Sequence, residues 1–85
     1  MQPGIEAPRS IGEDLQDLDE TELAIERLER RIEAQEVRIA QLKRDGIDCS
    51  TAQQIRANMH QSLSELLKHR SLVQHALAYR KRRSA

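Results

Sequence analysis

Aliphatic side chains recur every three or four residues in the first half of the chain. With Leu18 as position a of a heptad, the a positions are Leu18, Ile25, Ile32 and Ile39, and the d positions are Thr21, Leu28, Gln35 and Leu42. Six of these eight residues are aliphatic, and the flanking e and g positions are largely charged. This unbroken alternation predicts a helix with a coiled-coil seam and a left-handed supercoil.

A second apolar stripe lies between residues 50 and 81. It consists of Ile55, Met59, Leu63, Leu66, Val73 and Leu77. Ser62 and Arg70 fall inside the stripe, and Leu67 lies at its edge. The apolar arc is wider than in the first half, as expected for a helix that meets more than one neighbour.

The segment Asp45-Gly46-Ile47-Asp48 separates the two stripes and predicts a turn. Two cations precede Gly46, which suits a helix end followed by a residue in the left-handed conformation. Ser50 has capping-box spacing to Gln53, and Asp48 is a second candidate cap. Such a short connection predicts that the second helix runs back beside the first. One uninterrupted helix through Gly46 is the alternative, but the Gly-Ile-Asp-Cys-Ser stretch argues against it.

We therefore predict an all-α fold, an antiparallel two-helix hairpin over residues 13–81. The first helix covers about 14–45, or begins nearer Asp19; the turn is 46–49 and the second helix covers about 50–81. Residues 1–12 have two prolines, two glycines and little to bury, which predicts a disordered leader. Residues 82–85 form a basic tail.

Composition supports paired helices. The chain has 85 residues, enough for one domain, with no Trp or Phe and with Tyr79 as its only aromatic residue. Aliphatic side chains must therefore pack along a seam, which suits helices better than sheets. No apolar run resembles a signal peptide or approaches the roughly 20 residues of a membrane span, so we expect a cytoplasmic protein without a membrane partner.

Charge is segregated along the chain although the formal net charge is zero. Residues 1–26 carry eight acidic side chains and only Arg9, whereas residues 67–85 carry six basic side chains and no acid. A turn near residue 47 places residues side by side when their numbers sum to about 95. The acidic start then meets the basic end, which favours the antiparallel arrangement. Arg70 is expected near Ile25, within reach of Glu22 or Glu26.

The basic run Arg80, Lys81, Arg82 and Arg83, which overlaps this tail, also suggests contact with nucleic acid. We favour the structural explanation, because the acidic arm accounts for the charge and no aromatic residues are interleaved with the arginines.

Catalytic and metal chemistry find little support in the sequence. His60, His69 and His75 lack the spacing of a ligand pair on one helical face. His69 flanks the apolar stripe and is expected to be a hydrogen-bonded interface residue. Cys49 is the only cysteine, so an internal disulfide is excluded, and a redox-linked dimer is a weaker hypothesis. No phosphate-binding loop is present, and we predict neither enzyme activity nor a cofactor.

Four apolar residues lie away from the predicted seam: Leu23, Val37, Leu72 and Tyr79. A lone hairpin buries only one stripe of each helix, whereas two hairpins paired as a four-helix bundle would cover these side chains. The sequence thus predicts a homodimeric protein–protein interaction or structural module, which could also dock another protein through an exposed helix face.

The segment from Arg30 to Val73 resembles a group of small bacterial helical-hairpin proteins that have no established activity. The matching residues are Arg31-Ile32, Ala34-Gln35-Glu36, Ile39, Leu42, Asp45-Gly46-Ile47-Asp48, Ala52, the Leu63 to Leu67 run and His69-Arg70. Ile47 and Cys49 depart from the group's pattern, in which a His and a Thr often stand. The resemblance implies a hairpin and a bacterial cytoplasmic setting.

Overall fold

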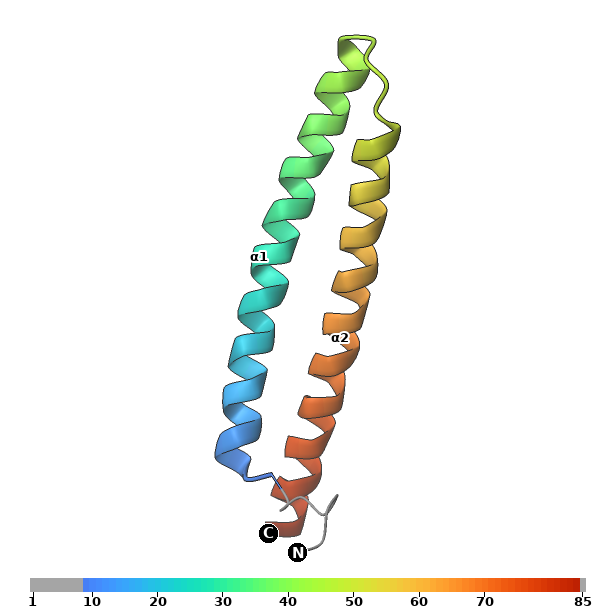
Figure 1. Ribbon diagram of the computed structural model, residues 1–85. Coiled ribbons are helices and arrows are strands. Elements are labelled where there is room, and N and C mark those ends of the chain that lie inside the picture. The colour runs from blue at the N-terminus through green and yellow to red at the C-terminus, as the bar shows by residue number, and fades with distance from the viewer. Residues whose placement is uncertain (1–8, 85) are drawn as a thin grey trace, which may run out of the picture.

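The computed structural model describes residues 9–84, so most of the predicted leader and Ala85 lie outside the described residues. Two helices lie side by side with opposite directions, α1 (Ile11–Arg44) and α2 (Ser50–Ser84), as Figure 1 shows. The described part of the chain contains no strand. The predicted all-α hairpin is therefore confirmed.

The helix α1 begins three residues earlier than the predicted start at residue 14. The Ser10 hydroxyl accepts a hydrogen bond from the Glu13 N–H at 3.1 Å, and the Glu13 carboxylate accepts one from the Ser10 N–H at 3.5 Å. This reciprocal capping box satisfies two N–H groups that a helix start leaves unpaired. The Ser-x-x-Glu signal lies inside the segment predicted to be a leader, where Gly12 in the first turn obscures it.

The end of α1 shows why Gly46 stands in the turn. The Gly46 N–H donates to the Lys43 carbonyl at 3.2 Å, and the Ile47 N–H donates to the Leu42 carbonyl at 2.9 Å. This pair of bonds defines a Schellman motif, which requires a left-handed residue just beyond the helix. Gly46 provides it with a φ of 69°.

The start of α2 is capped by Asp48, one of the two candidates together with Ser50. The Asp48 carboxylate accepts hydrogen bonds from the Ser50 N–H at 3.0 Å and from the Ser50 hydroxyl at 3.1 Å. Ser50 is thus the first helical residue, and Asp48 holds it from outside the helix. At the other end, α2 extends to Ser84 instead of ending near residue 81.

The core is a narrow band between the helices. Its buried apolar members are Ile25, Ile32, Ile39, Ala52, Val73 and Leu77. Other predicted seam residues are half-buried: Leu18, Leu28, Leu42, Met59, Leu63 and Leu66. Ile55 was predicted to lie in the seam, but its side chain is 42% exposed and Ala52 is buried instead.

The buried face of α2 coincides with the predicted apolar stripe from Met59 to Leu77 and differs from it in the first turns of the helix. Its buried and half-buried residues at heptad spacing are Ala52, Arg56, Met59, Leu63, Leu66, Arg70, Val73, Leu77 and Arg80. Three of these nine are arginines, whose long apolar stems can pack in a seam while the guanidinium group reaches its edge. Hydrophobicity alone therefore pointed to Ile55 and passed over Ala52.

The two helices are offset because the connection runs back along the end of α1 before α2 begins (Figure 1). An extended residue advances about 3.3 Å, roughly twice the rise of a helical residue. Residues 47–49 therefore shift the pairing relative to the rule based on a sum of 95. That rule puts His60 opposite Gln35, whereas the Gln35 amide donates to the Ala52 carbonyl at 2.9 Å.

Replacing Ile32 by Asp tests the seam. Ile32 is 7% exposed, whereas Val37 on the same helix is 58% exposed. Loss of the buried side chain alone costs about 2–5 kcal/mol, and a buried carboxylate adds to this cost. We expect Ile32→Asp to abolish the cooperative thermal transition seen by circular dichroism. Val37→Asp makes the same change in a helix and should retain the transition; equal melting of the two variants would contradict the assigned seam.

Candidate functional site

Polar residues meet at the open end of the hairpin, where α1 begins and α2 ends. We call this group the end cluster; its members are Arg9, Asp14, Asp17, Thr21, His69 and Arg80. Asp14 lies at its centre and is only 4% exposed. The Arg9 Nε lies 3.1 Å from one Asp14 carboxylate oxygen, and the Arg80 guanidinium binds the other. A buried carboxylate thus lies between two cations, one of them from α2.

Asp17 forms the second link across the helices. The His69 Nε2 lies 2.9 and 3.1 Å from the two Asp17 carboxylate oxygens. Arg9 reaches the same carboxylate at 3.2 Å. The buried Thr21 hydroxyl donates to the Asp17 carbonyl at 2.7 Å. His69 is therefore a hydrogen-bonded interface residue, as the sequence predicted.

The surroundings of Asp17 favour its ionised form. Its pKa is lowered from the ordinary value chiefly by the hydrogen bond with His69; the Coulombic attraction of His69, a hydrogen bond from Thr21 and the charge of Arg9 also lower it, against partial desolvation. At the turn, the pKa of Asp48 is lowered by its two hydrogen bonds from Ser50. Both carboxylates are held as structural acceptors rather than as proton donors.

The ionic contacts differ in part from those expected. Arg80 meets the acidic start of α1, in line with the predicted charge pairing. Among the residues whose side chains are described, however, no ion pair joins Arg70 to Glu22 or Glu26. His60 approaches Glu36 at 3.9 Å instead, near the middle of the hairpin.

The residues of the predicted nucleic-acid contact lie in different environments. The Arg80 side chain is 29% exposed and is committed to Asp14. Lys81 and Arg82 are exposed, whereas the side chain of Arg83 lies outside the described ones. A phosphate group could therefore reach at most part of the Arg80–Arg83 run without breaking the end cluster.

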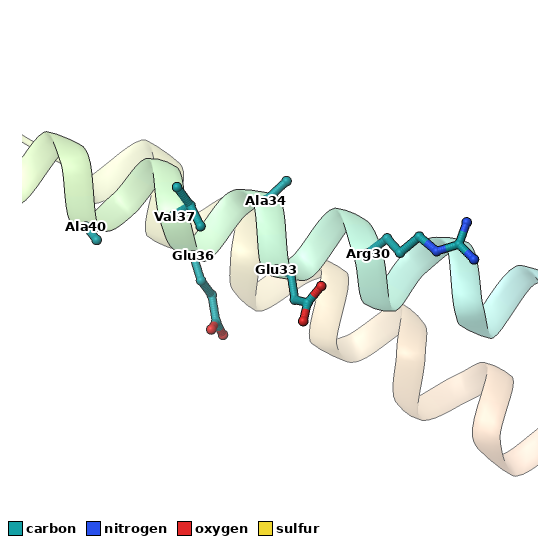
Figure 2. Close-up of a pocket in the computed structure, with 6 residues that line it drawn as sticks. All are labelled: Arg30, Glu33, Ala34, Glu36, Val37 and Ala40. Carbon is teal, nitrogen blue, oxygen red and sulfur yellow. The ribbon is translucent and has the colours of Figure 1, made fainter.

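Two surface hollows accompany these features, and neither resembles an enclosed pocket. One, of about 420 Å³, borders the end cluster along Arg9, Glu13, Gln16, Asp17, Glu20 and His69. The larger, of about 620 Å³, is lined by six residues that all belong to α1 (Figure 2). Figure 2 shows Ala34 and Val37 on the side away from α2, with the carboxylates of Glu33 and Glu36 pointing the other way.

No group of three or more His, Cys, Asp or Glu side chains in the described part of the chain could hold a metal ion. Cys49 is a half-buried free thiol in the connection. None of the helices described is both long and apolar enough to cross a membrane. The donors and acceptors of the end cluster are paired with one another, as expected for a structural link between the two helices.

Comparison with known proteins adds no family to this description. No protein-family model, curated protein or solved structure matches the chain.

The sequence pointed to His69 and Arg80 but passed over Arg9 and Asp14. Asp14 lies one heptad before Thr21, so the d row extended by seven residues would have placed it in the seam. Arg9 lies in the segment predicted to be a leader, and no periodic signal covers it. Both residues are charged, and charged residues at the acidic start of a helix are ordinarily expected to be exposed to solvent.

Replacing Arg80 tests whether the end cluster stabilises the hairpin. Arg80→Met retains an apolar stem but leaves the buried Asp14 with one cation fewer. We expect the free energy of unfolding in urea to fall by about 1–3 kcal/mol. Lys81→Met removes an exposed charge next to it and should change that free energy by less than about 0.5 kcal/mol. Equal effects would show that Arg80 has no special structural role.

Acid titration tests the Asp17–His69 link. Because the pKa of Asp17 is lowered in the folded state, its contribution to stability is present above the ordinary pKa. It is lost as the pH falls through the lowered value. Between about pH 5 and about pH 2, unfolding in urea should show a larger loss of stability for the wild type than for Asp17→Asn. Asp19→Asn serves as a control, and a wild-type profile parallel to that of Asp17→Asn would contradict the link.

Proposed function

We propose that the chain is a non-enzymatic protein–protein interaction or structural module that associates with further copies of itself. The observation that carries this proposal is the balance of its apolar residues. Six apolar residues are buried in the hairpin, but nine large ones are between 38% and 70% exposed. No side chain in the described residues is less than 2% exposed. A lone hairpin thus leaves much of its apolar surface in water, and association would cover it.

The simplest closed arrangement is a dimer in which two hairpins form a four-helix bundle. Such a bundle gives each helix a second neighbour and builds a core that two helices cannot. The long straight faces of α1 and α2 support this arrangement (Figure 1). A bacterial cytoplasmic setting, implied by the resemblance to small helical-hairpin proteins, belongs to the same proposal.

Mass measurement in solution tests self-association. Multi-angle light scattering should give at least twice the 9.8 kDa of one chain. Because ion pairs between exposed charges are screened by salt, measurements at low salt and at about 0.5 M salt would show how far charge contributes. A mass of one chain over about two decades of concentration would contradict the proposal.

Binding to nucleic acid through the C-terminal end is the second candidate, and the exposure of Lys81 and Arg82 is the observation in its favour. It requires an affinity that falls steeply with salt and that is lost when residues 80–85 are removed. The commitment of Arg80 to Asp14 weighs against it. A gel-shift assay at low salt that shows no complex would eliminate this candidate.

A further inference from the structure

A row of exposed residues on α1 has a regular pattern; Val37 lies on the side away from α2, and Glu33 lies at the flank with its carboxylate turned the other way (Figure 2). We call this row the α1 outer stripe; its residues are Asp19, Leu23, Glu26, Arg30, Glu33 and Val37. They follow one another at intervals of four and three residues, so they form one row along the helix. All six are exposed, including Leu23 at 45% and Val37 at 58%. The larger surface hollow lies over the C-terminal part of this row (Figure 2).

The outward side of α2 has a row of the same spacing and the opposite charge. We call it the α2 outer stripe; its residues are Lys68, Leu72, His75, Tyr79 and Arg82. All five are exposed, and Leu72 at 70% is the most exposed of the large apolar residues described. A hollow of about 290 Å³ lies over its end, lined in part by His75, Tyr79 and Arg82. The row therefore presents apolar groups between cationic ones.

Neither charged row is neutralised within the hairpin. Among the described side chains, the acids Asp19, Glu26 and Glu33 form no ion pair. Glu29 lies three residues after Glu26 and four before Glu33, so like charges are neighbours on the helix surface. Such neighbours destabilise a helix by about 0.2–0.5 kcal/mol per pair. Arg30, four residues after Glu26 and three before Glu33, offsets part of this cost within one copy, and cations of a second copy would offset the rest.

We propose that the α2 outer stripe of a second copy docks on the α1 outer stripe, with the two helices antiparallel. This inference rests on the proposed self-association and names the surfaces that carry it. One register places Asp19 beside Arg82 of the second copy. The same register places Glu33 beside its Lys68. Both pairs join opposite charges, which favours this register over its neighbours.

The same register also matches the apolar positions between the charges. Leu23 lies beside Tyr79 of the second copy, which covers two exposed apolar side chains with each other. The aliphatic stem of Arg30 lies beside its Leu72. Over about two heptads, charged residues of one stripe thus lie beside opposite charges of the other, and apolar groups lie beside apolar groups.

His75 is oriented for this contact by its own helix. Its Nδ1 lies 2.7 Å from the Ser71 carbonyl, which is the geometry of an N–H donor. The opposite ring nitrogen, Nε2, is then left to face outward. In the proposed register the His75 ring lies beside Glu26 of the neighbouring copy.

The contact joins two different surfaces, so it is heterologous. The two stripes lie on opposite outer sides of one hairpin, and one copy cannot use both toward the same neighbour. Each added copy therefore leaves one stripe of each kind open at the ends. Heterologous contacts that do not close by rotation give open assemblies. An assembly built by this contact alone should therefore increase in mass steadily with concentration, whereas the closed four-helix dimer described above would stop at two chains.

Charge reversal in two complementary variants tests the proposal. The first, Glu26→Lys with Glu33→Lys, makes both outer stripes basic; the second, Lys68→Glu with His75→Glu, makes both acidic. All four positions are exposed, so the thermal melts should stay close to that of the wild type. Sedimentation equilibrium should show that each variant alone has an association constant at least about tenfold lower than the wild type. An equimolar mixture should regain the wild-type mass, because each α1 outer stripe again meets an α2 outer stripe of opposite charge.

The control is Glu22→Lys with Glu29→Lys, which reverses the same number of charges on the same helix but outside the stripe. It should lower the association constant less than the first variant does. If the wild type is a single chain at every concentration, the proposed function fails and this inference fails with it. If the wild type associates but the mixture does not regain its mass, or the control matches the first variant, self-association stands and the assignment of the stripes is wrong.

Discussion

The structure depends on the packing of one row of isoleucines on α1 against a helix that runs the other way. Ile25, Ile32 and Ile39 are each at most 7% exposed, and they follow one another at intervals of seven residues. They find a partner because Gly46 lets the chain leave α1 in a left-handed conformation and turn back. Without that reversal, α1 would have no intramolecular surface to cover its seam.

Charge adds orientation to this packing. The core band is thin at the open end, where Asp14 and Thr21 occupy positions that isoleucine or leucine takes elsewhere. Arg80 crosses from α2 to Asp14, and His69 crosses to Asp17. These links hold together the end farthest from the covalent turn, where the helices would otherwise separate most readily. The acidic beginning and the basic end of the chain thus contribute to one clasp.

Most of the fold could be predicted from the sequence, but the first turns of α2 and part of the end cluster could not. The 3–4 alternation on α1, the Schellman turn at Gly46 and the cap at Asp48 are local signals, and each appears in the structure where its residues stand. The first turns of α2 are different, because which of their residues face α1 depends on how residues 47–49 lead the chain into the second helix. Ile55 was therefore placed in the seam on hydrophobicity, although geometry selects Ala52. Only part of the end cluster could be predicted, because Asp14 is paired with Arg80 by tertiary contact and Arg9 lies in the segment predicted to be a leader.

The hairpin architecture offers exposed helix surfaces for interaction instead of an enclosed pocket. Two helices packed along one seam leave their outer faces open, and in this chain those faces carry ordered rows of charge and apolar groups. The buried seam accounts for the fold, and the outer rows lie on exposed surface. We propose that their complementarity between copies gives them a role in self-association.

A distance between the two arms tests the central claim most directly. Spin labels at Gln16→Cys and Gln74→Cys, in a Cys49→Ser background diluted with unlabelled protein, would report the separation of α1 and α2 within one chain. Helices packed 8–10 Å apart predict a distance below about 30 Å, including the labels. One continuous helix through Gly46 would place the labels about 87 Å apart at 1.5 Å per residue. A distance near the second value would contradict the hairpin and every contact derived from it.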